Sequence, residues 1–115
     1  MERESTITVR PNAGRHRYEL VDGDRVIGKA HWLPFEHNTV LERIFYHTTV
    51  KEEYGGQGLA ATLARFALED TVAAGLKIVT VCPYFKGYVA KHPEYRQHTA
   101  PVRPEHLAAV DAAAK

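Results

Sequence analysis

Cysteine is scarce in this 115-residue sequence, and long apolar segments are missing. The one cysteine, Cys82, has no second cysteine to pair with, which excludes an internal disulfide and is typical of a reducing compartment. No apolar run approaches the roughly 20 residues that a membrane helix needs. The first residues, Met1–Glu4, are charged and have no apolar core behind them, so a secretory signal is not expected. We therefore expect a cytoplasmic protein that does not enter a membrane.

An excess of charge of either sign is also lacking. The sequence has 15 basic and 14 acidic residues, which gives a net charge of +1. This balance gives no electrostatic reason to expect nucleic acid or an anionic membrane as a partner. The length fits one domain over residues 1–115, which can bury roughly two-thirds of its unfolded surface without a disulfide or a metal.

Histidine is plentiful, with seven copies. Their spacings, such as His31 to His37 and His92 to His98, fit no zinc-binding template, so no metal site is predicted. His98 and His106 lie in polar segments and are expected to be exposed.

Alternation of apolar and polar residues with a period of two predicts strands in the first half of the chain. Two short strands come first, at Ile7–Val9 and Arg17–Leu20. A third is predicted over Arg25–Leu33, and Pro34 is expected to stop it. A fourth strand is predicted over Asn38–Val50, and its last residues are bulky on both faces, which suits a central strand.

The period becomes that of a helix after Gln57. A helix is predicted over 59–74, with Gly75 at its C-cap and one apolar stripe made of Leu59, Leu63, Phe66 and Ala67. A short strand at Ile78–Val81, a helix at Pro83–Lys91 and a terminal helix over 105–114 complete the pattern. The strand–helix–strand unit places the fourth and fifth strands parallel, whereas the earlier hairpins are antiparallel. The predicted fold is therefore α/β (α+β), with a mixed, mostly antiparallel sheet and one parallel unit.

Three glycines fall within Gly55-Gly56-Gln57-Gly58, between the fourth strand and the long helix. Glycine permits a sharp turn and close approach to backbone N–H groups, and the first turn of a helix offers unpaired donors. Together these features are typical of an anion site. The Walker pattern does not fit, because Leu59 and Ala60 follow Gly58, and the dinucleotide fingerprint does not fit either. A tight turn without a ligand is the alternative, but its position between a buried strand and an amphipathic helix favours the anion site.

The segment Val50–Ala60 resembles motif A of the GNAT N-acetyltransferase superfamily, which reads Arg/Gln-x-x-Gly-x-Gly/Ala. Gly58 and Ala60 match its last two fixed positions, and Gly55 stands where the family usually has Arg or Gln. Four more segments make the sequence similar to the short YjdJ-type group of this superfamily: His47–Val50, Gly75–Lys77, Cys82–Phe85 and His92–Tyr95. The resemblance implies a GNAT-like acyl-CoA N-acyltransferase fold, in which the sheet splays between its fourth and fifth strands to admit a pantetheine arm.

The resemblance also implies acetyl-CoA as co-substrate. Motif A cradles the pyrophosphate mainly through backbone N–H groups, which assigns this role to Gly55, Gly56, Gln57, Gly58, Leu59 and Ala60. One charge-assisted contact is missing at Gly55. The backbone late in the fourth strand, at Thr48, Thr49 and Val50, is implied to bind the amides of pantetheine.

Three side chains are candidates for acetyl transfer, which requires that the amine lose a proton and that the leaving thiolate be stabilised. His47, near the place of the acetyl group in the family, can take a proton near neutral pH, or it packs as an ordinary strand residue. Cys82 precedes a helix whose dipole favours a thiolate, so it lines the site, carries the acetyl group itself, or is a small buried residue. Tyr88 corresponds to a tyrosine that protonates the CoA sulfur in the family, with Tyr84 as its rival, and both can also be core aromatics.

The predicted function is acetyl-CoA-dependent transfer of an acetyl group to an amine of a small molecule, a peptide or a protein. The alternatives are a non-catalytic module that binds CoA or acyl-CoA, and an interaction domain that binds no nucleotide. Larger family members have helices between their early strands that build an acceptor pocket. Because only residues 34–38 occupy that place here, we expect an open, shallow acceptor site.

Overall fold

The computed structural model describes residues 7–113. The strands are β1 (Ile7–Asn12), β2 (Arg17–Asp22), β3 (Arg25–His37), β4 (Val40–Val50) and β5 (Lys77–Thr80), and the helices are α1 (Leu59–Ala73), α2 (Pro83–Lys91) and α3 (Pro104–Ala113). The five strands form one sheet in sequence order, antiparallel from β1 to β4 and parallel between β4 and β5. The predicted mixed sheet is confirmed. The predictions for Met1–Glu4 and Ala114 lie outside the described residues.

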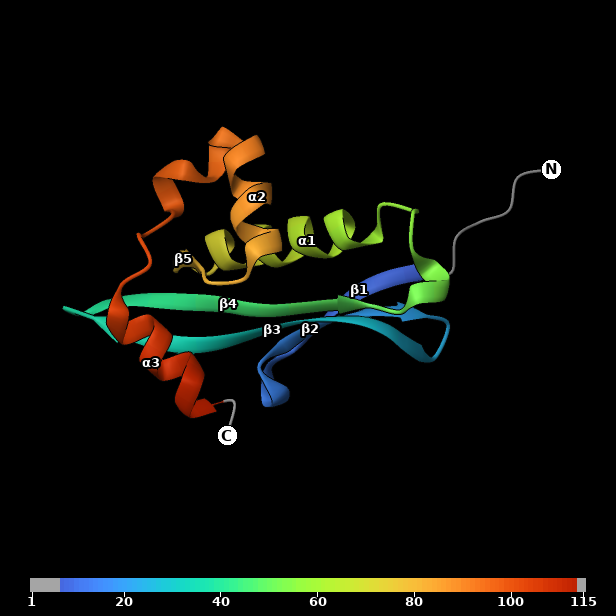
Figure 1. Ribbon diagram of the computed structural model, residues 1–115, viewed down its shortest axis with the longest axis horizontal. Coiled ribbons are helices and arrows are strands. Elements are labelled where there is room, and N and C mark those ends of the chain that lie inside the picture. The colour runs from blue at the N-terminus through green and yellow to red at the C-terminus, as the bar shows by residue number, and fades with distance from the viewer. Residues whose placement is uncertain (1–6, 114–115) are drawn as a thin grey trace.

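The helices cover the two faces of the sheet unequally. Helices α1 and α2 lie on one face, and α3 lies on the other, beneath β3 and β4 (Figure 1). Because successive strand side chains point to opposite faces, each strand contributes to both layers. We call the face that carries α1 and α2 the helical face, and we call the opposite face the α3 face.

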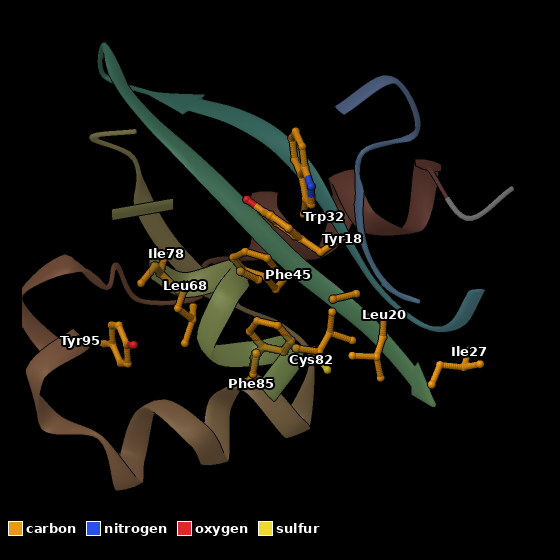
Figure 2. Packing of buried hydrophobic residues seen from close by; sticks show 14 residues of the cluster. Tyr18, Leu20, Ile27, Trp32, Phe45, Leu68, Ile78, Cys82, Phe85 and Tyr95 are labelled. Atoms are coloured by element: carbon orange, nitrogen blue, oxygen red, sulfur yellow. The ribbon is translucent and has the colours of Figure 1, made fainter. Parts of the chain in front are cut away.

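The core lies between α1, α2 and the helical face. The rings of Phe45 on β4 and Phe85 on α2 stack with centroids 4.5 Å apart, and Leu68 of α1 packs into the same cluster (Figure 2). The buried stripe of α1 consists of Leu63, Ala64, Ala67, Leu68 and Thr71. Phe66, predicted to lie in that stripe, is 38% exposed, because it flanks the stripe and contacts the Tyr18 ring only edge-on.

Strand β3 does not stop at Pro34, contrary to the prediction. Pro34 lies inside the strand and pairs with Arg43 of β4. The reason is that β2 pairs with β3 only as far as His31, so Pro34 lies where β3 has β4 on one side and no strand on the other. The N–H that proline lacks is not needed at such an edge. Asn38 and Thr39 form the turn, with φ of 50° and 66°, and β4 begins two residues later than predicted.

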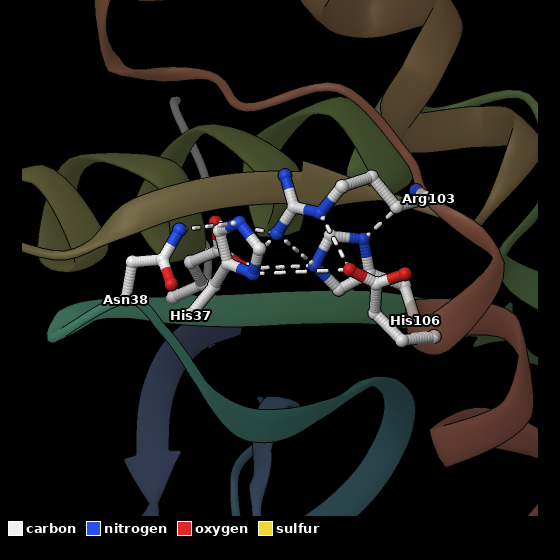
Figure 3. Close-up of polar contacts among 6 residues, drawn as sticks. His37, Asn38, Arg103 and His106 are labelled. Carbon is white, nitrogen blue, oxygen red and sulfur yellow. Dashed lines mark hydrogen bonds and ion pairs between the residues drawn. The ribbon is translucent and has the colours of Figure 1, made fainter.

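His106 is fully buried, so its predicted exposure is wrong. It lies in the first turn of α3, where its Nδ1 accepts the backbone N–H of Arg103 at 3.0 Å and its Nε2 lies 2.7 Å from Glu42 Oε1 (Figure 3). Since Nδ1 is an acceptor, Nε2 carries the proton and donates to the carboxylate. Arg103 bonds to the same carboxylate at 3.1 Å. This cluster fixes α3 against β4, a tertiary contact that the local polarity of the sequence does not reveal.

None of the helices among residues 7–113 has the length and apolar character that a membrane crossing requires. In the same part of the chain, no three His, Cys, Asp or Glu side chains are grouped as a metal ion would need.

Candidate acyl-CoA site

The glycine turn adopts a backbone shape that other residues disfavour. Gly56 has φ of 80° and Gly58 has φ of 70°, both in the left-handed region. A Cβ atom placed on either glycine would meet no heavy atom within 4 Å, so open space lies beside the backbone at both positions. The turn is therefore a cradle that a ligand can approach, and the glycines are required there by their dihedral angles.

Helix α1 begins directly after this turn, with Gly58 as its N-cap residue. No side chain caps the helix, and its first turn contains no acidic residue. The first N–H groups of a helix have no partner within the helix, and they carry the positive end of its dipole. The arrangement suits a phosphate group, because the uncapped start of the helix lies beside the open space at Gly56 and Gly58.

Two contacts tie the preceding loop to the β2–β3 hairpin. Tyr54 donates its hydroxyl hydrogen to Asp22, and Arg25 bonds to Glu53 at 3.0 Å. The hydrogen bond to Asp22 is the main reason why the pKa of Tyr54 is raised above its usual value. No local pattern predicts this contact, because Tyr54 and Asp22 are distant in the chain. These contacts attach the residues that precede the glycine turn to the β2–β3 hairpin.

A wedge opens between β4 and β5 next to the turn. The two strands pair only from Glu42–Lys77 to Phe45–Thr80, and the N–H groups of Val81 and Cys82 then both donate to the carbonyl of Phe45, at 3.0 and 2.8 Å. Beyond Phe45, β4 continues to Val50 and pairs only with β3. Its other edge is thus open, and unpaired strand edges offer backbone N–H and C=O groups to an extended ligand. The splayed sheet implied by the resemblance is present.

A bulge marks the point where the wedge opens. His31 pairs with His47 and Trp32 pairs with Phe45, so Tyr46 is an extra residue on β4. Bulges bend a strand and re-aim the side chains that follow. Here the bulge brings Thr48 to the helical face, opposite Ala30, and His47 to the α3 face, opposite His31. No local pattern in the sequence predicts this bulge.

Cys82 lies at the apex of the wedge. It is the N-cap residue of α2 and is 4% exposed. Its Sγ lies 3.3 Å from Oγ1 of Thr48, so the structure brings together two of the residues that sequence analysis assigned to the site.

His47 is exposed on the other face of β4. Its ring stacks on His31 with centroids 5.8 Å apart. The structure therefore separates His47 and Cys82 onto opposite sides of one strand, although Thr48 is the direct neighbour of His47. A molecule on the helical face meets Cys82, and a molecule on the α3 face meets His47.

Tyr88 and Tyr84 both lie on α2. Tyr88 stacks on His92 with centroids 4.0 Å apart and, with Arg65 and Glu69 of α1, lines a hollow of about 640 Å³. These contacts lie toward the C-terminal end of α2, and no hydrogen bond or ring contact among the described residues joins Tyr88 to the thiol of Cys82. Burial raises the pKa of Tyr88, and burial also raises that of Tyr84, which is 40% exposed.

The fold and the site together define a class of protein: a small mixed sheet, splayed between its fourth and fifth strands, with a glycine cradle at the next helix. Residues 17–98 match the family model of GCN5-related N-acetyl-transferase. The chain belongs to this family, since the match covers more than half of its length.

Individual relatives agree with this assignment. Protein NATD1 of Gallus gallus is 39% identical over 57 residues, which are 48% of this chain and 52% of that protein, so the match spans about half the length of that relative. A GCN5-like protein of Staphylococcus aureus, solved by NMR, superposes with a TM-score of 0.63 and 21% identity over 90% of this chain and 97% of its own. A ribosomal-protein-alanine N-acetyltransferase from Brucella melitensis superposes with a TM-score of 0.54 and 14% identity over 76% of this chain and 62% of that one. At these identities the superpositions establish a shared fold.

Proposed function

We propose that this chain is an acetyl-CoA-dependent N-acetyltransferase of the short YjdJ-type group, acting on an amine of a small molecule, a peptide or a protein. The observation that carries the proposal is the uncapped, glycine-lined start of α1 beside the open edge of β4. Members of the family use acetyl-CoA as co-substrate. The diphosphate of acetyl-CoA needs N–H donors such as those at the start of α1. Its extended pantetheine arm needs backbone N–H and C=O groups such as those on the open edge of β4.

The proposed roles of the backbone follow from this geometry. The N–H groups from Gly56 to Ala60 bind the diphosphate, and the backbone of Thr48, Thr49 and Val50 binds the amides of pantetheine along the open edge of β4. The N–H of Gly55 is not available for this role, because it donates to the carbonyl of Glu52 at 3.0 Å. This arrangement directs the acetyl group toward the apex of the wedge, between Cys82 and the bulge at Tyr46.

The proposed chemistry is direct transfer. The nitrogen of the acceptor amine forms a bond to the acetyl carbon, the carbon–sulfur bond breaks, and the products are an amide and the CoA thiol. His47 takes the proton that the amine loses, and Tyr88 returns a proton to the sulfur. A tyrosine phenol carries its proton near neutral pH and can therefore donate it.

Cys82 has a lining role in this proposal. The polar neighbour of its thiol is the hydroxyl of Thr48, a poor base, whereas an attacking cysteine requires a partner that removes its proton. Transfer through an acetyl-cysteine is the alternative, and the helix N-terminus at Cys82 is the feature that favours it.

We assign the acceptor only as an amine, which belongs to a small molecule, a peptide or a protein. A structural neighbour from a soil metagenomic sample is an aminoglycoside acetyltransferase in complex with sisomicin, and another acts on ribosomal-protein alanine. The tight Asn38–Thr39 turn between β3 and β4 leaves no helix to enclose an acceptor, which supports an open site. We further propose that residues 1–115 act as one domain in the cytoplasm, where the lone thiol of Cys82 stays reduced.

Two measurements test the function. A thermal-shift titration with acetyl-CoA should raise the melting temperature, because a ligand that binds only the folded state stabilises it. Release of free thiol from acetyl-CoA with a panel of amines should then detect turnover. Binding without turnover on any amine would favour a non-catalytic CoA-binding module, which the glycine at position 55 also permits, and absence of binding at millimolar acetyl-CoA would overturn both.

A further inference from the structure

The α3 face of the sheet carries a group of basic side chains that the fold does not use to hold α3. Arg10, Arg17, Lys29, His31 and His47 come from four neighbouring strands, and we call them the basic face. The register places them in two rows, with Arg10, Glu19, Lys29 and Thr49 in one and Asn12, Arg17, His31 and His47 in the other. Helix α3 packs further along β3 and β4, against Phe35 and Glu42. In the two rows Arg10 and His47 are exposed, and Arg17, Lys29 and His31 are half-buried.

The basic face has more positive than negative charge. Its one carboxylate, Glu19, is buried, and Arg10, Asn12 and Arg17 saturate its oxygens at 2.9, 3.0 and 2.8 Å. Lys29 forms no ion pair with any residue from 7 to 113. The positive charges of the basic face act on His31. Its pKa is lowered first by burial and then by the positive charges of His47, Arg17 and Lys29.

The position of His47 connects this charge with the proposed site. Cys82 and the glycine cradle lie on the helical face, so acetyl-CoA would occupy that side of β4. The acceptor must then reach the wedge from the α3 face, where His47 is exposed beside Lys29 and His31. An acceptor amine at His47 accordingly lies on the same face as the positive charges of Lys29 and Arg17, which attract negative groups on either side of it.

We propose that the basic face docks an acidic polypeptide segment whose amine is the acceptor, an inference that rests on the proposed function. Four strands span about 14 Å at the usual strand spacing, a length that about four extended residues cover. A nucleic acid fits less well, because it needs a longer basic stripe and domains that bind it usually have a pI above about 9. The pI of this chain is 7.9.

A direct binding experiment tests the docking without any need for turnover. A labelled short peptide with a central lysine between glutamates and aspartates is titrated with the protein and followed by fluorescence anisotropy. The matched peptide has glutamines and asparagines at the same places. At low ionic strength the acidic peptide should bind at least about tenfold more tightly than the neutral one, and the difference should shrink in 0.5 M salt, where the screening length is only a few ångströms.

The charge reversal Lys29→Glu should weaken binding of the acidic peptide by about 3- to 10-fold. The matched control is Lys91→Glu, an exposed lysine at the end of α2 on the helical face. It makes the same change in net charge and should leave the affinity for the peptide unchanged. In turnover assays, Lys29→Glu should raise KM for the acidic peptide and leave its kcat unchanged, which is the pattern of lost docking.

Several results would overturn the docking proposal. These are equal affinity for acidic and neutral peptides, equal effects of Lys29→Glu and Lys91→Glu, or tighter binding of a single-stranded oligonucleotide of the same charge. The proposed function fails separately, if acetyl-CoA does not bind or if no amine is acetylated. The anisotropy measurement decides the docking in either case.

Discussion

The hydroxyl of Thr48 lies 3.3 Å from the thiol of Cys82, across the gap where β4 and β5 part. This contact joins the open edge of β4 to the N-cap residue of α2, so the strand proposed to hold pantetheine and the only thiol of the chain meet at one point. His47, the next residue along β4, faces the other way. The proposed site is therefore two-sided, with the co-substrate and the acceptor on opposite faces of one strand.

The two-sided site predicts unequal effects for its two candidate residues. His47→Ala should lower kcat by about 100-fold or more, because it removes the proposed base. Cys82→Ala should keep kcat within about tenfold, because direct transfer forms no bond to sulfur. Both are measured as thiol release from acetyl-CoA at saturating amine.

Mass spectrometry provides the control for this pair. If the intact protein gains one acetyl group at Cys82 on incubation with acetyl-CoA, and Cys82→Ala is inactive, the reaction proceeds through an acetyl-cysteine and direct transfer is wrong. If both variants retain full turnover, neither side chain takes part in the chemistry, and the proposed role of His47 as the base is wrong.

Replacement of Gly58 tests the cradle. Gly58→Val places a β-branched residue at φ of 70°, a conformation that costs L-residues about 1–2 kcal/mol. The turn should therefore change shape, and the Kd for acetyl-CoA should rise by about tenfold or more. Gly87→Ala in the interior of α2 is the matched control, since Gly87 has no positive φ and a Cβ there meets nothing within 4 Å. It should raise the melting temperature and leave the Kd unchanged.

Gly55 offers a test in the opposite direction. Its φ of −66° and ψ of 155° suit any residue, and an added Cβ meets only the carbonyl oxygen of Glu52, at 3.2 Å. Gly55→Arg should lower the Kd for acetyl-CoA by about 3- to 10-fold, because it supplies a charge-assisted contact to phosphate in an exposed position. Gly55→Ala separates the added Cβ from the charge. Equal Kd values for the two variants would show that no phosphate lies within reach of this position.

Acid should destabilise the protein through Glu19. Burial alone would raise the pKa of this carboxyl group, but the hydrogen bonds from Arg17, Asn12 and Arg10 outweigh it and lower the pKa from 4.5 to about 2. The folded state thus favours the ionised form, which contributes about 3 kcal/mol above pH 4.5, and this contribution is lost as the pH falls toward 2.

Urea unfolding at pH 7 and at pH 3 measures this effect. The loss of unfolding free energy between the two values should be smaller in Glu19→Gln than in the parent, although that variant is less stable at pH 7. Glu36→Gln, at an exposed position of β3, should keep the parent's dependence on pH. An unchanged dependence in Glu19→Gln would contradict the assignment.

Removal of His106 should loosen α3. His106→Ala leaves the buried carboxylate of Glu42 with Arg103 alone and opens a cavity beside Phe35, at a cost of about 2–4 kcal/mol. Faster hydrogen exchange in α3 and a lower melting temperature are expected. Leu107→Ala, at a neighbouring position that is 52% exposed, should change the unfolding free energy by less than about 0.5 kcal/mol. Equal melting temperatures for the two variants would exclude the role given to His106.

Local patterns of the sequence were sufficient for most of the elements and for the glycine turn before α1. Period-two and helical spacing reflect which side of each element is buried, so α1, α2 and the order of strands could be predicted, and Pro83 marked the first residue of α2 correctly. The glycines at 56 and 58 have the positive φ that their position in motif A suggests.

Only the tertiary structure decided which residues meet. Pro34 is tolerated in β3 because β2 ends earlier, His106 is buried because Glu42 lies opposite it, and the bulge at Tyr46 turns His47 away from Cys82. Each outcome depends on a partner distant in the sequence, and a local pattern contains no information about such a partner. The chemistry of the site depends on the same kind of contact, because proton transfer requires atoms that only the folded sheet brings within reach.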